Sequence, residues 1–356
     1  MIDSIRIQGY RSVRLVRLRL DPVTVVAGKN GTGKTNLYRA LRLFQHAAAG
    51  TLARAITGEG GMESVLWAGD EKKGAKRRVA IEAHLDDFAY TLELGLPPAD
   101  ETSAFDLDPE VKLERISVQG STIAERKGAS ATVRDSEGRA VTFPFALWSG
   151  ESMLSQIADP ERFPALPALR DHFLGWRFYH HFPTDADAPA RRAMVRVRTP
   201  VLAADGHDLA SALRTIVEIG DTERLVAAVD RAFPGCRLHL DGSTIALTTP
   251  GLRRPLAAPE LSDGTFRYLY LLAALLTPRP PGLLAFNEPE TSLHPGLLRP
   301  LAELVAAVPQ PCQVWLTTHA LPLAEAAATL AGIALIHLDR QDGTTVVRGQ
   351  GLLDRL

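Results

Sequence analysis

Residues 28–35 read GKNGTGKT, and this octapeptide constrains the fold more than any other part of the chain. The pattern G-x-x-x-x-G-K-[ST] forms a loop whose backbone N–H groups surround phosphate, between a strand and a helix N-terminus. Residues 23–27 are a short apolar, β-branched run, and residues 35–44 repeat apolar residues at helical spacing. We therefore predict a strand, a phosphate-binding loop and a helix in succession; the structural alternative is a chance glycine turn.

The loop residues have distinct predicted roles in binding ATP and Mg²⁺. Glycines let the backbone fold tightly and turn its N–H groups inward. Lys34 is expected to reach the β- and γ-phosphates, and the Thr35 hydroxyl is expected to ligate Mg²⁺. The predicted nucleotide-binding set is Gly28, Lys29, Asn30, Gly31, Thr32, Gly33, Lys34, Thr35 and Asn36.

Length and charge limit the class of protein. The 356 residues suffice for one large α/β domain or for two domains, and the net charge of −1 gives no overall basic field for nucleic acid. Cys236 and Cys312 are too far apart in sequence to suggest a disulfide framework or a zinc site. The N-terminus is too polar for a signal peptide, and the longest apolar run, residues 268–276, is too short to span a bilayer. We expect a cytoplasmic protein that is not bound to a membrane.

Hydrophobic patterning predicts an α/β chain in three parts. Residues 1–150 are predicted to form a mixed sheet with an antiparallel portion, residues 151–235 a helical lobe, and residues 236–356 alternating helices and strands around a parallel sheet. The strands predicted in the antiparallel portion are residues 78–85, 90–96, 111–118, 122–126 and 141–145, and the clearest helices are residues 208–219 and 222–233.

A second apolar run, residues 282–290, ends in the polar sequence NEPE. In a P-loop ATPase, a strand beside the loop carries an acidic residue near Mg²⁺ at its tip, and an adjacent Glu polarises the attacking water. We therefore predict that Glu288 is the general base and that Asn287 lies near Mg²⁺. The structural alternative for Glu288 is a cap on the following helix.

Two further segments are candidate phosphate contacts. LSDGT precedes an apolar helix at residues 266–276, and a Ser with backbone N–H groups at a helix N-terminus can bind phosphate or simply cap the helix. We predict that Ser262, Asp263 and Gly264 contact a nucleotide held by a second protomer. His319 ends the apolar strand at residues 314–318 and is predicted to contact the γ-phosphate or the attacking water, although a lone histidine at a strand end is usually structural.

The four segments GKNGTGKT, LSDGT, LLAFNEPETSLHP and LTTHA resemble, in this order, the head of an ABC-type ATPase. The opening IRIQGYRSV and the EPE-x-x-LHP segment resemble the RecF/SMC-like group, especially its stand-alone predicted ATPases. The resemblance covers residues 1–45 and 255–340. It implies a P-loop NTPase fold, an ABC-type head with a mixed sheet plus an inserted helical lobe, that hydrolyses ATP with Mg²⁺.

The resemblance also assigns roles to residues. The Walker A motif is the P-loop described above, the signature motif is Ser262 to Gly264, Walker B is Asn287 and Glu288, the D-loop region is residues 292–294, and His319 is the switch histidine. Gln156 falls where such heads place a glutamine that contacts Mg²⁺ and water, although it could also be a surface residue on a helix. Arg11 matches an arginine that approaches the nucleotide.

Two positions depart from the family pattern. Asn287 stands where Walker B carries an aspartate. Its oxygen can accept a hydrogen bond from Mg²⁺-bound water but carries no charge, so we predict weaker Mg²⁺ retention or slow turnover, not loss of the site. Asp263 stands where a glycine is common, and a carboxylate near a γ-phosphate is unfavourable unless it points away.

The leading functional hypothesis is a homodimer that closes on two ATP molecules and acts as a switch or clamp on DNA, in repair or in genome or phage defence. The alternative is a nucleotide-controlled regulatory subunit for a separate effector protein such as a nuclease; a transporter ATPase subunit fits the motifs less well. Two basic clusters are candidate DNA contacts or ordinary solvated surface: Lys72, Lys73, Lys76, Arg77 and Arg78, and Arg191, Arg192, Arg196 and Arg198.

Overall fold

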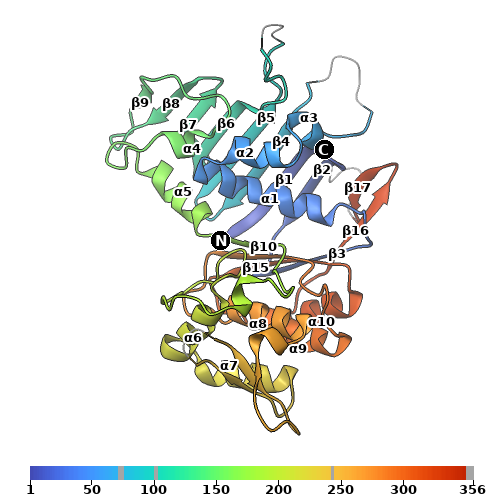
Figure 1. Cartoon of the computed structure of the whole chain (residues 1–356). Coiled ribbons are helices and arrows are strands. Elements are labelled where there is room, and N and C mark those ends of the chain that lie inside the picture. Colours follow the sequence, from blue (N-terminus) through green and yellow to red (C-terminus); the bar gives the residue numbers. More distant parts are fainter. Residues whose placement is uncertain (71–75, 100–102, 242–243, 350–356) are drawn as a thin grey trace. The chain divides into compact units, whose positions relative to one another are not determined.

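The computed structural model describes residues 1–70, 76–99, 103–241 and 244–349 (Figure 1). It divides the chain into two compact units. Unit 1 comprises Met1–Asp21, Gly28–Trp176 and His337–Leu356, and unit 2 comprises Pro22–Ala27 and Arg177–Ile336. The boundaries predicted at residues 150 and 235 do not coincide with this division. Packing and strand pairing explain the difference. Phe173 packs on Phe44, so unit 1 extends past residue 150, whereas residues 177–179 and 22–27 join the parallel sheet of unit 2.

Unit 1 contains an eight-stranded antiparallel sheet in the order β2-β1-β4-β5-β6-β7-β8-β9. Its strands are β1 (Ile2–Tyr10), β2 (Val13–Arg19), β4 (Val79–Leu85), β5 (Phe88–Gly95), β6 (Glu110–Val118), β7 (Ser121–Lys127), β8 (Ser130–Arg134) and β9 (Ala140–Thr142). The antiparallel portion predicted from the sequence is confirmed. β8 was not predicted because it is only five residues long, although its two buried residues alternate regularly with exposed ones.

Helices cover one face of this sheet (Figure 1). They are α1 (Lys34–Ala49), α2 (Leu52–Gly58), α3 (Met62–Val65), α4 (Met153–Gln156) and α5 (Ala165–Leu174), and the hairpin of β16 (Ile336–Gln341) and β17 (Thr344–Val347) completes the unit. The ring of Phe44 on α1 lies 5.4 Å from that of Phe173 on α5, which lies 5.5 Å from Tyr90 on β5. This aromatic cluster anchors α1, and with it the helix N-terminus at the P-loop.

Unit 2 is built on four parallel strands in the order β10-β14-β15-β3. They are β3 (Val23–Ala27), β10 (Arg177–Tyr179), β14 (Leu283–Asn287) and β15 (Gln313–Thr318). Every residue of β3, β14 and β15 is buried, as expected for parallel strands covered on both faces. The strands predicted at residues 23–27 and 314–318, and the strand predicted within residues 282–290, are confirmed.

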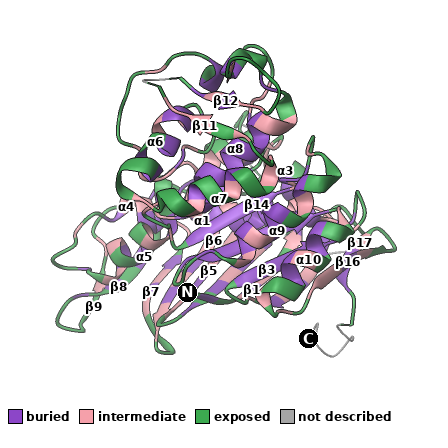
Figure 2. Cartoon of the chain, turned by 90° about the horizontal axis from the view of Figure 1, so that it is seen from below, coloured by how far each residue is buried: buried purple, intermediate pink, exposed green. Residues whose placement is uncertain are grey.

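The helices of unit 2 are α6 (Leu209–Ile219), α7 (Thr222–Ala232), α8 (Asp263–Leu275), α9 (Leu298–Ala306) and α10 (Leu321–Ala331), with 3₁₀ turns η1 (Pro189–Arg191), η2 (Ala258–Glu260) and η3 (Pro295–Leu297). A small sheet contains β11 (Arg237–His239), β12 (Ala246–Thr248) and β13 (Leu256–Ala257). Within α8, all residues from Phe266 to Leu275 are buried (Figure 2). The LSDGT segment therefore opens the central helix of this unit. Among the helices that the structure describes, none is long and apolar enough to cross a membrane.

Candidate functional site

The P-loop in unit 1 has the backbone that its glycines permit. Gly31 and Gly33 adopt φ angles of +81° and +102°, which side chains on Cβ disfavour. A Cβ at Gly33 would also clash with the Thr345 hydroxyl on β17, whereas a Cβ at Gly31 would meet open space. Gly33 is therefore required both by its backbone conformation and by its contact with β17.

Lys34 is the first residue of α1 and is buried. Its Nζ donates to the carbonyl oxygens of Gly28 at 2.8 Å and Lys29 at 3.0 Å, so the ammonium lies over the loop. Asn36 donates from Nδ2 to the Ser12 hydroxyl at 2.9 Å, which ties the first turn of α1 to the β1–β2 turn. The first turn of α1 contains no acidic residue that would repel an anion. This donor set fits a polyphosphate and its Mg²⁺.

In unit 2, the parallel strands end in register at one edge of the sheet. Asn287 pairs with Thr317, and Thr318 pairs with Ala27, so Glu288 and His319 follow neighbouring strand ends. The P-loop starts one residue after Ala27 in the chain. The carboxyl edge of an open parallel sheet is where ligands bind in α/β proteins.

Glu288 occupies an unusual backbone position. Its φ is +50°, although it is not a glycine and precedes a proline. Its N–H donates to the Thr317 carbonyl at 2.8 Å, which holds this turn against β15. The nearest helical turn, η3, is capped by the His294 side chain, so the alternative that Glu288 caps a helix is wrong. Backbone strain of this kind concentrates at functional positions.

Glu290 is a residue that the sequence reasoning missed. Its buried Oε1 accepts from the Thr318 hydroxyl at 2.5 Å and from the His319 N–H at 2.9 Å, and it lies 3.1 Å from His319 Nδ1. The same Nδ1 is 3.7 Å from Glu288 Oε2. When Nδ1 carries the proton toward Glu290, Nε2 is the nitrogen available to a phosphate or a water. The repeated carboxylate in the EPE segment was the only sequence signal for this role.

Asn287 is held by two side chains of the same edge. Its Oδ1 accepts from the Thr317 hydroxyl at 2.8 Å, and its Nδ2 lies 2.9 Å from Nδ1 of His180. His180 follows β10, which is parallel to β14, and was not among the predicted site residues. A short apolar run ending in a polar residue, RFYH, was the sequence signal for its position.

The signature segment lies at the N-terminus of α8. Ser262 caps this helix, because its hydroxyl accepts from the Thr265 N–H at 3.2 Å. A Cβ at Gly264 would lie 2.8 Å from the Ser292 carbonyl, so the glycine permits close packing on the D-loop region. A pocket of about 720 Å³ adjoins these residues, and its lining includes Ser262, Gly264, Thr265, Ser292, His294 and Arg231.

Arg267, one turn into α8, joins the signature helix to the Walker B turn. Its buried guanidinium donates to the carbonyl oxygens of Pro289 at 3.2 Å and Glu288 at 3.4 Å. Burial lowers the pKa of Arg267, and the charge of Glu290 partly offsets this effect. The backbone around Glu288 therefore depends on a residue of the helix that carries LSDGT.

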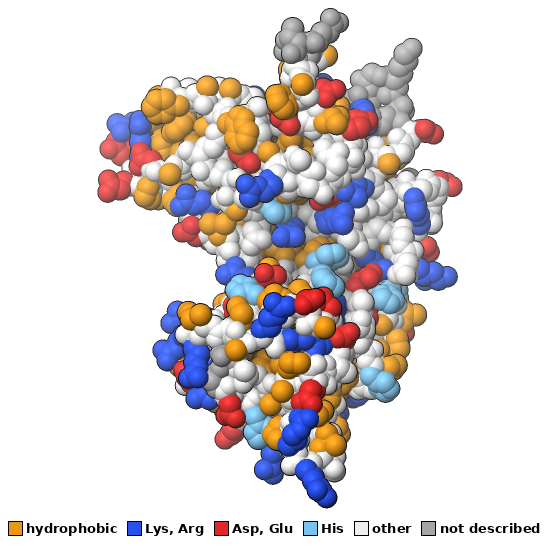
Figure 3. All heavy atoms as spheres, viewed as in Figure 1, with side chains coloured by type: hydrophobic (Ala, Val, Ile, Leu, Met, Phe, Trp, Pro, Cys, Tyr) orange, Lys and Arg blue, Asp and Glu red, His pale blue; other side chains and the backbone are white. Residues whose placement is uncertain are grey.

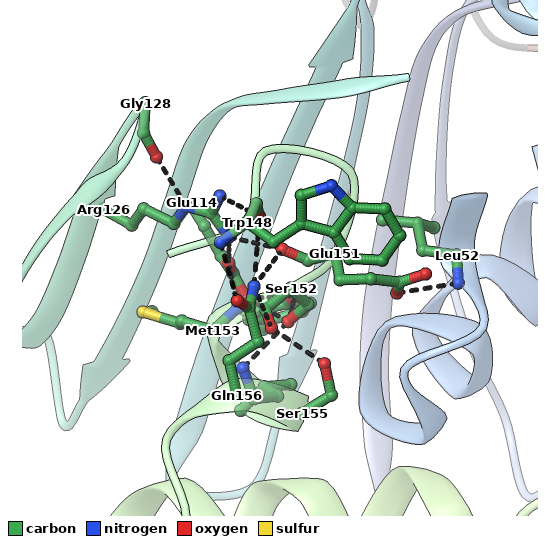
Figure 4. A network of polar contacts seen from close by, with 12 residues as sticks. Leu52, Glu114, Arg126, Gly128, Trp148, Glu151, Ser152, Met153, Ser155 and Gln156 are labelled. Carbon is green, nitrogen blue, oxygen red and sulfur yellow. Dashed lines mark hydrogen bonds and ion pairs between the residues drawn. The ribbon is translucent and has the colours of Figure 1, made fainter. Parts of the chain in front are cut away.

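Gln156 lies in a different environment from the one predicted. Its Oε1 accepts from the Trp148 N–H at 2.7 Å, and its Nε2 donates to the Glu151 carbonyl at 2.8 Å (Figure 4). The same network contains buried Arg126 and Glu114, 3.9 Å apart. These bonds give Gln156 a structural role within unit 1, and contact with Mg²⁺ would require them to break.

Arg11 is likewise engaged inside unit 1. It lies in the turn between β1 and β2 with a φ of +52°, and its guanidinium is 2.7 Å from the Glu59 carboxylate. The predicted approach of Arg11 to a nucleotide would have to compete with this ion pair. No group of three metal-binding side chains occurs in the described ranges.

Comparison with known proteins agrees with these features. A family model described as "AAA domain, putative AbiEii toxin, Type IV TA system" matches residues 23–324. The solved SMC head bound to the C-terminal winged-helix domain of ScpA is 16% identical, with a TM-score of 0.54 and coverage of 100% of this chain and 99% of that one.

A second solved structure is an SMC head domain with an extended coiled coil, bound to the C-terminal domain of ScpA derived from Pyrococcus furiosus. It is 14% identical, with a TM-score of 0.51, and the alignment covers 97% of this chain and 95% of that one. These likenesses confirm the predicted α/β P-loop NTPase fold, which resembles an SMC or ABC-type head. No curated protein matches the chain.

Proposed function

The chain belongs to the AAA-domain family whose model covers residues 23–324, a family of P-loop ATPases, and from this premise we propose that it is an ATP-driven switch that closes as a homodimer. The observation that carries the proposal is the carboxyl edge of the parallel sheet in unit 2. There, Glu288 and His319 follow adjacent strand ends. The buried carboxylate of Glu290 accepts a hydrogen bond from the backbone N–H of His319 and also contacts the His319 ring.

In the proposed reaction, Lys34 and the backbone of the P-loop bind the phosphates of ATP. Glu288 accepts the proton of the attacking water, and His319 contacts the γ-phosphate or that water through Nε2. Thr35 and Asn287 are the side chains that would hold Mg²⁺, which supplies compensating positive charge when it is bound. The neutral side chain of Asn287 favours slow turnover.

In the proposed dimer, Ser262 and the N-terminal N–H groups of α8 contact the nucleotide of the other protomer. Binding then favours the closed state, because ATP makes contacts there that it lacks in the monomer. Hydrolysis removes those contacts and releases the dimer. The link from α8 through Arg267 to the Glu288 carbonyl supports this proposal, since it connects the signature helix to the catalytic turn of the same protomer.

Mass measured by light scattering, with ATP and Mg²⁺, tests this function. We expect the wild type to dimerise transiently, Glu288→Gln to remain dimeric because the water is not activated, and Lys34→Ala to remain monomeric. Glu325→Gln is a matched control, because Glu325 is exposed on α10, and it should behave as the wild type does. A mass that never depends on nucleotide would exclude the switch.

We propose DNA as the output of the switch, in repair or in genome or phage defence. A regulatory subunit that assembles with a separate effector protein, such as a nuclease, is the second candidate. One surface feature favours this candidate: Phe145 and Trp148 are 70% and 62% exposed in the segment after β9. Large exposed aromatic side chains of this kind are enriched at protein interfaces.

A further inference from the structure

Arg191, in the 3₁₀ turn η1, was grouped with candidate DNA contacts, but its side chain is only 4% exposed. All five of its N–H donors are accounted for within unit 2. Nε and Nη2 donate to the Thr184 carbonyl at 2.9 and 2.7 Å, and Nη1 donates to the carbonyls of Ala258 at 2.7 Å and Leu261 at 2.9 Å. Nη2 also donates to Asp263 Oδ1 at 2.9 Å.

These contacts enclose the signature segment. The guanidinium binds the carbonyl of Leu261 before the motif and the carboxylate of Asp263 within it, and it lies 4.6 Å from the ring centre of Phe266 after it. A buried guanidinium with every donor paired has a single orientation. Arg191 is therefore built to hold one conformation of LSDGT.

The carboxylate of Asp263 would repel a nearby phosphate, and the positive charge of Arg191 reduces this repulsion. The Asp263 side chain is 61% exposed at the first residue of α8, where the proposed function places a phosphate of the other protomer's ATP. Like charges in such a position oppose association. The Arg191 charge, 2.9 Å away on the protein side, compensates the carboxylate and draws Oδ1 toward the protein.

We propose that Arg191 is a positioning residue that makes the signature motif compatible with a nucleotide anion by neutralising Asp263. This inference rests on the proposed function, because it assumes that LSDGT faces ATP across a dimer. It extends that function by explaining how a carboxylate is tolerated within the motif. The occupant of the surface is then the triphosphate of a nucleotide bound to a second copy of the chain.

The test is a double-mutant cycle on the ATP concentration that gives half-maximal dimerisation, measured by light scattering with Mg²⁺. We expect Arg191→Gln to raise this concentration at least about fivefold, since it leaves Asp263 uncompensated. Asp263→Asn in the same chain should restore most of the loss, because the repelling charge is gone. Arg191→Lys, which keeps the charge, should lie much closer to the wild type than Arg191→Gln does.

A purely structural role for Arg191 predicts a different pattern. The carbonyls of Thr184, Ala258 and Leu261 would lose their donors in Arg191→Gln whatever stands at position 263, so Asp263→Asn would restore nothing. ATP affinity of the monomer, followed with a fluorescent analogue, should be unchanged in Arg191→Gln if the role is confined to the dimer. A changed monomer affinity, or equal losses in Arg191→Lys and Arg191→Gln, overturns the inference.

The experiment can refute the inference about Arg191 without refuting the proposed function. If the wild type dimerises with ATP but the cycle shows no coupling between Arg191 and Asp263, the inference is wrong and the proposed function stands. If the wild type remains monomeric at every ATP concentration, both are wrong. Should Arg191→Gln not fold, Arg191→Lys and Asp263→Asn still decide the outcome: loss of dimerisation in Arg191→Lys despite normal thermal stability contradicts charge compensation.

Discussion

At the scale of single residues, Asn287 is buried and carries a neutral amide at the position where Walker B carries an aspartate. Its side chain is held between the Thr317 hydroxyl and the His180 ring, at 2.8 and 2.9 Å. An amide can satisfy both partners without charge, whereas a carboxylate can only accept. The edge of the sheet thus holds a neutral side chain through two hydrogen bonds, at the position for which slow turnover is predicted.

The substitution Asn287→Asp tests this reasoning. We expect the Mg²⁺ concentration for half-maximal ATPase activity to fall by about tenfold, because a carboxylate attracts the cation more strongly than an amide does. The turnover number should rise. The measurement is ATPase rate against Mg²⁺ concentration at saturating ATP.

A new ion pair with His180 could change the activity for another reason, so Asn287→Asp is also made together with His180→Ala. An effect on Mg²⁺ should persist in this background. An unchanged Mg²⁺ dependence in Asn287→Asp would show that the side chain at position 287 does not affect Mg²⁺ binding.

At the scale of elements, α1 carries a histidine whose ionisation is linked to folding. His46 lies in the last turn of the helix, and its Nδ1 is 2.9 Å from the Thr51 hydroxyl. Burial, with a smaller contribution from Arg42, lowers the pKa of His46 from 6.5 to about 4. The folded state therefore favours the neutral imidazole, and the unfolded chain binds an additional proton between these pH values.

The sign of the resulting pH dependence follows from this difference. The stabilisation is complete above pH 6.5 and is lost as the pH falls toward 4. Since one pKa unit corresponds to about 1.4 kcal/mol, the wild type should lose roughly 2 kcal/mol of unfolding free energy through His46 between pH 7.5 and pH 5. Urea denaturation at the two pH values measures the loss.

Two variants isolate the contribution of His46 from that of other titrating groups. His46→Gln should show a smaller decrease in unfolding free energy over the same interval. His181→Gln, which replaces an exposed histidine, should retain the wild-type decrease. Equal decreases in all three proteins would exclude His46 as the linked group.

At the scale of the whole molecule, the distribution of charge limits binding to DNA. The chain has a net charge of −1, and basic and acidic side chains are interspersed on the face of each unit that Figure 3 shows. Several arginines of the two predicted clusters are paired: Arg77 with Glu63, Arg78 with Glu93, Arg192 with Asp187 and Arg198 with Glu218. Lys72 and Lys73 lie outside the described residues.

DNA binding is therefore expected to be weak and to depend on few phosphate contacts. With two or three such contacts, affinity should fall by roughly 10- to 40-fold between 50 and 200 mM salt. Fluorescence anisotropy of labelled duplex DNA, with the Glu288→Gln protein and ATP, measures this affinity. Arg196 is exposed and, among the described residues, has no ion-pair partner, so Arg196→Ala should lower the affinity and reduce the salt dependence by about one phosphate contact.

Arg253→Ala, which removes another exposed arginine of unit 2, is the control and should have little effect. Absence of binding at 50 mM salt with ATP would remove DNA as the output. The effector-subunit alternative would then be the remaining proposal.

Much of the fold was predictable because its signals are local. Alternation, apolar runs and glycine positions were sufficient for most strands, the long helices and the P-loop. The assignments that the structure placed differently depend on partners distant in sequence. Arg11 pairs with Glu59, 48 positions away, and Arg191 reaches Asp263, 72 positions away. The exposure and ion pairing of an arginine cannot be predicted from the residues next to it in the sequence.

The sequence alone determined most of the order of elements and the chemistry available at each motif, because the spacing of apolar residues, the conformational freedom of glycine and the identity of side chains are properties of short segments. Only the tertiary structure decided that residues 22–27 join the parallel sheet of unit 2, that His180 and Glu290 belong to its carboxyl edge, and that Arg191 compensates Asp263. Strand pairing and burial of charge bring together residues far apart in the chain, and such proximity depends on the complete fold.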